Sequence, residues 1–141
     1  MGRDEILGLL DRRDGAWNAH DARGVAATHA ADGVVISPTG GVLEGRSEIE
    51  RVYRVWFTAF PDIVTRREDV VIDGNQVAVL SRFTGTHAGE FFGLAPSGRR
   101  VEVDVALLIT VSDGLIAKER RVYDFTGLLV QVGVLKAKPV G

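Results

Sequence analysis

Asp124 is the residue whose position best suits acid–base chemistry. It follows Tyr123 at the end of a predicted strand, 115–124, and precedes the apolar segment 125–135. Alternation along the strand puts Asp124 on one face with Arg120 and Val122. A carboxylate at the apolar wall of a pocket can serve as a general base or a general acid. The competing interpretation is a cap at the strand end or a salt bridge to a neighbouring arginine, and the residues leave both open.

His87 is the second candidate, directly after the predicted strand 76–86. A neutral imidazole there can donate a hydrogen bond to a developing enolate oxygen or share a proton with an acid. The alternative is a histidine that holds a loop together. The other two histidines, His20 and His29, are expected in two N-terminal helices, and their spacing is not that of metal ligands. We therefore expect no metal.

Asp104 is the third candidate, on the predicted strand 99–112. One face of this strand is apolar throughout, whereas the other begins with Glu102 and Asp104 and continues with Ala106 and Leu108. This pattern suits a strand that runs from solvent into a lined pocket, with Asp104 at the transition. It equally suits an exposed carboxylate paired with a nearby arginine.

An aromatic stripe provides a wall for such a site. The best-signalled helix begins with capping-box spacing between Ser47 and Glu50 and ends before Pro61. The stripe either forms core or lines a cavity for a flat ring system, and helical spacing does not separate the two uses. Together with Trp17 of the first helix, the stripe contains Tyr53, Trp56, Phe57 and Phe60.

The remaining elements place helices first and strands afterwards. A first helix carries its apolar stripe over residues 6–17, and a shorter one begins at Asp21 and runs through His29 to Gly33. A short strand is predicted at 34–36 and a loop at 38–41. Long strands joined by tight turns at 73–75 and 113–114 then form an antiparallel meander, and the tail 125–135 packs back as a short helix or coil. Helices over one face of such a sheet give an α+β fold with a pocket between the layers.

Composition restricts the function further. The 141 residues suit one domain, 1–141, with 45% hydrophobic residues and a net charge of −2, so no basic surface indicates nucleic acid. Cysteine is absent, which excludes disulfides and thiol chemistry. The start is not a signal peptide, and the most apolar stretch, 101–111, is too short and too charged to span a membrane. We expect a cytoplasmic protein.

Several segments resemble the SnoaL-like polyketide cyclases, in order over nearly the whole chain. The most specific are the block Gly85–Arg99, which reads Gly-Thr-His and ends Gly-Arg, and the ending that runs from Asp124 through Leu128, Leu129 and Gln131 to Gly133. The resemblance implies a cone-shaped α+β barrel, the fold shared with ketosteroid isomerase, scytalone dehydratase and nuclear transport factor two. Phe92, inside the block, joins the aromatic residues expected to contact substrate.

The resemblance also implies intramolecular aldol closure of a polycyclic aromatic polyketide ester, without metal or cofactor, in a homodimer or tetramer. The acid–base aspartate of the family corresponds to Asp124, and the histidine of the block corresponds to His87. Two alternatives stay open. One is an epoxide hydrolase or hydroxylase of the same fold, with Asp104 and Asp124 as paired carboxylates. The other is a non-catalytic module that binds a small apolar molecule.

Overall fold

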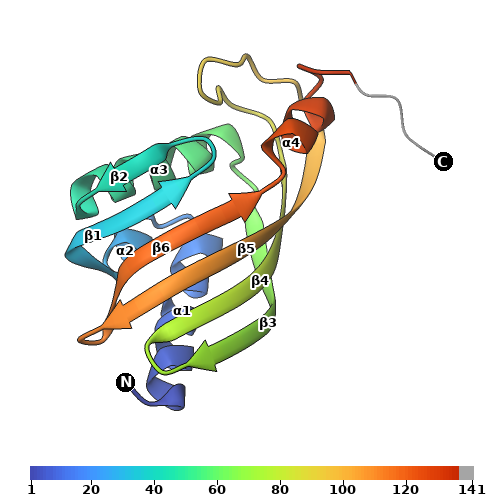
Figure 1. The fold of residues 1–141 in the computed structure, drawn as a ribbon. Helices are drawn as coiled ribbons and strands as arrows, with labels where there is room; N and C mark the ends of the chain where they lie inside the picture. Colours follow the sequence, from blue (N-terminus) through green and yellow to red (C-terminus); the bar gives the residue numbers. More distant parts are fainter. Residues whose placement is uncertain (137–141) are drawn as a thin grey trace.

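The computed structural model describes residues 1–136, and residues 137–141 of the predicted domain lie outside this range. Helices and a six-stranded sheet form an α+β fold, as predicted (Figure 1). The helices are α1 (Arg3–Asn18), α2 (Ala22–Ala26), α3 (Arg46–Ala59) and α4 (Phe125–Gln131). The strands are β1 (His29–Ser37), β2 (Gly41–Glu44), β3 (Val64–Asp73), β4 (Gln76–Thr86), β5 (Arg100–Ser112) and β6 (Leu115–Tyr123).

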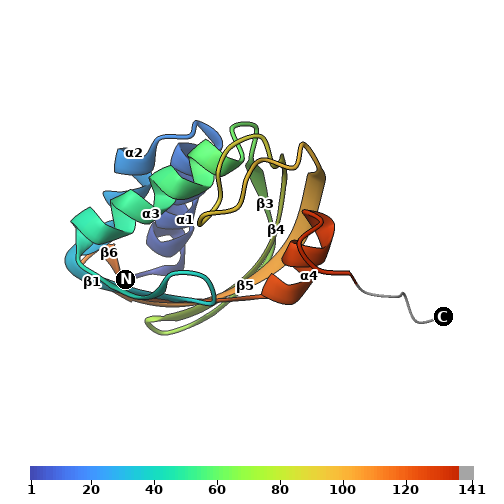
Figure 2. The ribbon, with the colours of Figure 1, turned by 90° about the horizontal axis from the view of Figure 1, so that it is seen from above.

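The sheet is strongly curved and has the strand order β2-β1-β6-β5-β4-β3. Neighbouring strands are antiparallel except β1 and β6, which are parallel. Seen from above, α1, α2 and α3 lie on the concave side of the sheet (Figure 2). A strongly twisted sheet curls in this way around whatever covers its face. The interior between the helices and the strands β3 to β6 is therefore where a ligand can be enclosed.

Two tight turns join the long strands where the sequence predicts them. Between β5 and β6, Asp113 and Gly114 have φ of 52° and 79°, the left-handed values that a type I′ hairpin turn requires. Gly74, between β3 and β4, has a φ of 59°. Most side chains are strained at such angles, whereas Asp, Asn and Gly tolerate them. These turns hold β3 to β6 as one continuous meander.

Apolar residues fill the interior in two clusters. One packs the first turns of α1 against the inner faces of the long strands, through Ile6, Leu9 and Leu10. The other is aromatic and surrounds α3, whose predicted stripe is largely buried. Its rings meet mostly edge to face, as in the contact of Trp17 with Tyr53 at 5.7 Å between ring centroids. The predicted helical stripe is therefore mainly core.

The expectation that His29 belongs to a helix is wrong. The helix α2 begins after the predicted cap Asp21, which accepts a hydrogen bond from the backbone of Gly24, but it ends at Ala26. His29 starts β1, where it pairs with Ile116 of β6. Pairing between distant segments outweighs the weak helical pattern of the residues before Gly33.

One further local expectation is corrected. The helix α3 begins at Arg46 after Gly45, and no side chain makes a capping bond, so Ser47 and Glu50 do not form the predicted capping box. The loop predicted at 38–41 leads into β2, an edge strand that pairs with β1 and for which no element was predicted. The end of α3 before Pro61 agrees with the prediction.

Candidate active site

The two faces of β6 have different surroundings. Glu119 and Arg121 point inward and are buried, whereas Arg120 and Val122 are exposed on the outer face. Asp124 follows on that outer side and is exposed. Arg120 and Val122 share one face of the strand, as predicted. This face, which was predicted to line the pocket, is the one exposed to solvent. The charged residues inside the curve of the sheet are Glu119 and Arg121.

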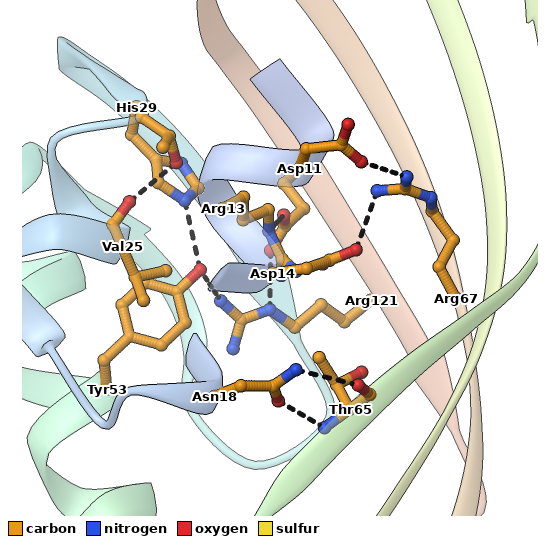
Figure 3. A network of polar contacts seen from close by, with 12 residues as sticks. Asp11, Arg13, Asp14, Asn18, Val25, His29, Tyr53, Thr65, Arg67 and Arg121 are labelled. Carbon is orange, nitrogen blue, oxygen red and sulfur yellow. Dashed lines mark hydrogen bonds and ion pairs between the residues drawn. The ribbon is translucent and has the colours of Figure 1, made fainter. Parts of the chain in front are cut away.

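A carboxylate and two guanidinium groups form a buried ion cluster there, within the network that Figure 3 draws. Glu119 accepts a hydrogen bond at Oε1 from Nε of Arg13, at 3.0 Å, and one at Oε2 from Nε of Arg121, at 2.7 Å. The Glu119 side chain is fully buried, and each arginine side chain is only 7% exposed. Arg13 comes from α1 and the other two from β6, so the cluster connects the first helix to the last strand.

Tyr53 of α3 and His29 of β1 extend this ion cluster (Figure 3). The Tyr53 hydroxyl accepts a hydrogen bond from Nη2 of Arg121 at 2.6 Å, and the guanidinium carbon lies 4.8 Å from the Tyr53 ring centroid. Nε2 of His29 lies 3.0 Å from the same hydroxyl. Either group can be the donor of that bond, depending on the tautomer of His29. Nδ1 of His29 is buried and without a partner among residues 1–136.

Asp14 connects the ion cluster to the surface. Its Oδ1 lies 3.5 Å from Nη1 of Arg13, and its Oδ2 accepts from Nη1 of Arg67 at 2.7 Å. Arg67, on β3, also donates to Asp11 of α1, whose side chain is 69% exposed. These contacts fix α1 against β3. Arg13 of α1 is therefore held by Glu119 on one side and by Asp14 on the other.

Burial and mutual attraction have opposite effects on the charged groups. Burial raises the pKa of Glu119, but the two arginines outweigh it and hold that pKa well below its usual range. For both arginines, burial lowers the pKa and the neighbouring Glu119 and Tyr53 raise it above its usual value. Burial lowers the pKa of His29 to about 4 and raises the pKa of Tyr53. At neutral pH the three ions are therefore charged, while His29 and Tyr53 are neutral.

A narrow cavity lies beside the ion cluster. Its volume is about 40 Å³, close to the share of one water molecule in the liquid, about 30 Å³. Pockets for drug-sized ligands measure about 300–1,000 Å³, so a multi-ring substrate requires wall side chains to move. Within the described part of the chain, the lining contains no carboxylate and no imidazole. The lining residues are Arg13, Trp17, Trp56, Thr65, Ser81, Phe83, Val105, Leu107, Arg121 and Tyr123.

Asp124 does not line this cavity. Its carboxylate accepts a hydrogen bond from the backbone N–H of Gly127 at 2.8 Å and caps the N-terminus of α4. The geometry is that of an N-cap aspartate, which satisfies an otherwise unpaired helix N–H. The position gives no support to the predicted role in proton transfer, which stays a prediction.

His87 organises the loop between β4 and β5. It is 1% exposed, and its Nδ1 accepts a hydrogen bond from the backbone N–H of Ser97 at 3.2 Å, with Oγ of Ser97 at 2.9 Å. Its backbone closes the loop through bonds with Gly98 and Arg99. Burial lowers the pKa of His87. Nε2 is buried near Phe60, without a partner among residues 1–136, and outside the cavity lining.

Asp104 lies on the outer face of the sheet. It accepts a hydrogen bond from Nε of Arg82 at 2.8 Å, which lowers the pKa of Asp104, and its side chain is 73% exposed. Arg82 also donates to Glu102 at 2.9 Å. Asp104, Asp124 and His87 are therefore not brought together at the cavity.

Two of the six aromatic residues predicted to contact substrate, Trp17 and Trp56, line the cavity. Tyr53 is fully buried behind it and positions Arg121.

The three phenylalanines of that set do not line it. Phe60 is fully buried, and Phe57 packs edge-on against Trp17, with ring centroids 5.2 Å apart. Phe92 is 44% exposed in the loop after β4.

Arg13, Glu119 and Arg121 were missed as site residues. A signal existed, because Arg13 falls within the apolar stripe of the first helix, between Leu10 and Trp17. A second signal is that Glu119 and Arg121 are two residues apart on one face of a strand. Neither signal predicts burial by itself, since charged side chains are rarely buried unless they pair. The pairing of Arg13 with Glu119 becomes evident only in the folded structure, where α1 meets β6.

Comparison with known proteins places this site in context. The family model described as SnoaL-like polyketide cyclase matches residues 9–132. A protein described as a SnoaL-like polyketide cyclase from Jannaschia sp. CCS1 is 28% identical, with a TM-score of 0.83, over 94% of this chain and 93% of that one. IdmH from Streptomyces antibioticus, described as a polyketide cyclase, is 30% identical, with a TM-score of 0.74, over 93% and 97%.

AclR from Streptomyces galilaeus, described as a hydroxylase, is 26% identical, with a TM-score of 0.85, over 98% of this chain and 91% of that one. No curated protein matches the sequence. Among the described residues, no three His, Asp or Glu side chains gather as metal ligands would. None of the helices in that part is long and apolar enough to cross a membrane.

Proposed function

Because the chain belongs to the SnoaL-like polyketide cyclase family, we propose that it catalyses an intramolecular aldol ring closure in a polycyclic aromatic polyketide ester, without a cofactor. The observation that carries the proposal is the position of Arg121, a buried guanidinium that lines an aromatic cavity and is fixed by Glu119 and Tyr53. Donors held in place at the point where charge develops are the largest single contribution in many enzymes.

The proposed reaction proceeds through an enolate. A C–H between two carbonyl groups of the substrate loses its proton to water at the cavity mouth, and the enolate oxygen accepts a hydrogen bond from Arg121. The enolate carbon then attacks a ketone of the same molecule, held against Trp17 and Trp56, and one C–C bond forms. The new alkoxide takes a proton from water, so the product has the mass of the substrate.

Arg121 replaces Asp124 and His87 at the centre of this mechanism. Proton transfer by either of those residues requires contact with substrate, and their positions do not provide it. Glu119 is ionised but lies behind the guanidinium groups, where it orients them. The protein therefore contributes orientation and charge stabilisation, and the acidity of a dicarbonyl substrate contributes the rest.

The test is mass spectrometry of wild-type protein, Arg121→Gln and Arg120→Gln incubated with tricyclic polyketide esters. Arg120 is the matched control because it is the next residue on β6 but is exposed on the outer face. We expect a product of unchanged mass from the wild type and the control, and a rate lower by about 10²–10³-fold in Arg121→Gln. Undiminished turnover in a folded Arg121→Gln protein would exclude this mechanism.

A second candidate function is a binding module that carries an apolar ligand. It is favoured by the lack of a carboxylate or imidazole among the cavity-lining residues of the described chain. It predicts tight binding with no conversion of any ester. A hydroxylase or epoxide hydrolase, as the likeness to AclR suggests, predicts a product heavier by oxygen or by water. That route has less support, because Asp104 and Asp124 face solvent.

A further inference from the structure

The two arginines of the ion cluster retain unused hydrogen-bond donors on the cavity side. A guanidinium has five N–H donors, and Arg121 uses Nε for Glu119 and Nη2 for Tyr53. Arg13 uses Nε for Glu119 and only a long contact of 3.5 Å for Asp14. No nitrogen of either arginine is among the buried atoms without a partner in the described chain. The unused nitrogens are therefore not fully buried, and both residues line the cavity.

The most deeply buried part of the network holds two positive charges and one negative charge, whereas the wider network, with Arg67, Asp14 and the exposed Asp11, holds three of each. Two guanidinium groups share the single carboxylate of Glu119, binding its two oxygens from different sides. Asp14 faces this pair only at 3.5 Å and makes its shorter bond to Arg67, which carries a positive charge of its own. The neighbouring His29 and Tyr53 are neutral and supply no negative charge.

The local excess of guanidinium over carboxylate at the buried end, next to an apolar cavity, favours an anionic ligand there. A buried charge is costly unless it is paired, and planar guanidinium groups match carboxylates through parallel hydrogen bonds. The walls on the other side are the indoles of Trp17 and Trp56 with Phe83. The site thus combines a cationic end with an aromatic end.

We propose that the ligand of this cavity is an apolar anion, whose ionised oxygen group, a carboxylate or the enolate of a 1,3-dicarbonyl, binds Arg13 and Arg121 together. The inference rests on the proposed function, because it concerns the same cavity. It does not require that the protein converts the ligand. It assigns Arg13 a direct contact with the ligand. Glu119 holds the side chains of both arginines in place. A volume of about 40 Å³ suits the charged end, and the apolar body enters as the aromatic walls move.

The chain contains its own reporter for this binding. It has two tryptophans, and both line the cavity, so their fluorescence responds to an occupant. Suitable probes are cyclohexanecarboxylate and cyclohexanecarboxamide, which have nearly the same shape, differ in charge and do not absorb at the tryptophan wavelengths. Titration of each into the wild-type protein, repeated by calorimetry, measures the charge preference without any variant.

We expect the carboxylate to bind at least about tenfold more tightly than the carboxamide, as hydrogen bonds to charged groups require. Arg121→Gln and Arg13→Gln should each lose most of this preference, and Arg120→Gln should retain it. Equal affinity of the two probes for the wild type, or no binding of either at millimolar concentration, would overturn the inference. If the wild type prefers the carboxylate but converts no ester, the inference stands and the cyclase function is refuted. If it converts an ester but binds the two probes equally, the cyclase function stands and the inference is refuted.

Discussion

Arg13 of α1 donates a hydrogen bond to Glu119 of β6 at 3.0 Å, across a separation of 106 residues. Both side chains of this bond are buried, at 7% and 0% exposure. The helix is therefore positioned on the sheet by directional contacts as well as by the apolar packing of Ile6, Leu9 and Leu10. The precise placement of the cavity wall depends on both.

Replacing the central carboxylate should destabilise the fold strongly. Glu119→Gln leaves Arg121 without its countercharge and Arg13 with only Asp14 at 3.5 Å, and removal of one partner of a buried ion pair costs about 3–5 kcal/mol. Urea denaturation at pH 7 measures the free energy of unfolding. The matched control is Glu102→Gln on the outer face, where the exposed pair with Arg82 contributes about 1 kcal/mol or less. Equal losses in the two variants would mean that the ion cluster does not stabilise the fold.

Replacement of Asp124 by Asn should be tolerated, whereas replacement by Ala should destabilise the protein. As an N-cap of α4 it needs a side-chain oxygen for the N–H of Gly127, which Asn also supplies, so Asp124→Asn should change stability little. Asp124→Ala should cost about 0.5–2 kcal/mol. Thermal unfolding measures both. A catalytic Asp124 predicts the same stability for the Asn variant but a rate of ester turnover lower by about 10²–10⁴-fold, so an activity assay of Asp124→Asn separates the two roles.

Stability should fall as the pH is lowered from 7 to 5. The pKa of His29 is lowered from 6.5 to about 4 in the folded protein, so the unfolded chain takes up its proton first. The resulting stabilisation is complete above pH 6.5 and is lost as the pH falls towards 4, by about 3 kcal/mol in total. Urea denaturation at several pH values measures the slope.

His87 contributes in the same direction, because burial lowers its pKa as well. The variants His29→Gln and His87→Gln are therefore measured side by side, and each should reduce the slope between pH 7 and 5. The lower limit at pH 5 stays above the ordinary pKa of unfolded glutamates such as Glu119, about 4.3, so their contribution to the slope is small. A slope unchanged in His29→Gln would show that its imidazole is not held neutral.

Gly89 should not accept a side chain. A Cβ added there would collide with the backbone carbonyl of Thr58 at the end of α3, and neither backbone can yield cheaply. Gly89→Ala should therefore lose about 1–3 kcal/mol. Gly15→Ala is the control, since it lies exposed within α1 with open space around it and should gain up to about 1 kcal/mol. Thermal unfolding of the two variants should shift in opposite directions.

Much of the fold follows from local patterns in the sequence. The long strands and their turns are predictable because alternation and the residues Gly74, Asp113 and Gly114 restrict the backbone to few conformations. The end of α3 is predictable because of Pro61. The pairing of His29 with Ile116 is not predictable in this way, because it depends on a strand that follows much later in the chain.

The site was predictable only in part. Helical spacing predicts the aromatic stripe but does not separate core from cavity wall. Trp17 and Trp56 line the cavity, and the substrate contact expected of them stays a prediction. The polar end was not, since strand alternation states which residues share a face but not which face turns inward. For β6 both faces carry charge, with Lys118 and Arg120 on one and Glu119 and Arg121 on the other. The face with Glu119 and Arg121 is the buried one because Arg13 of α1 pairs with Glu119 there.

The parallel pairing of β1 with β6 has a consequence for the order in which the protein can be made. The ribosome releases β1, with its apolar run Val34 to Ile36, long before β6, and until then the edge of β1 opposite β2 has no partner. An open apolar strand edge invites pairing with other chains. A full-length chain that refolds exposes the same edge until β6 docks on β1, so the refolding yield should fall as the protein concentration rises.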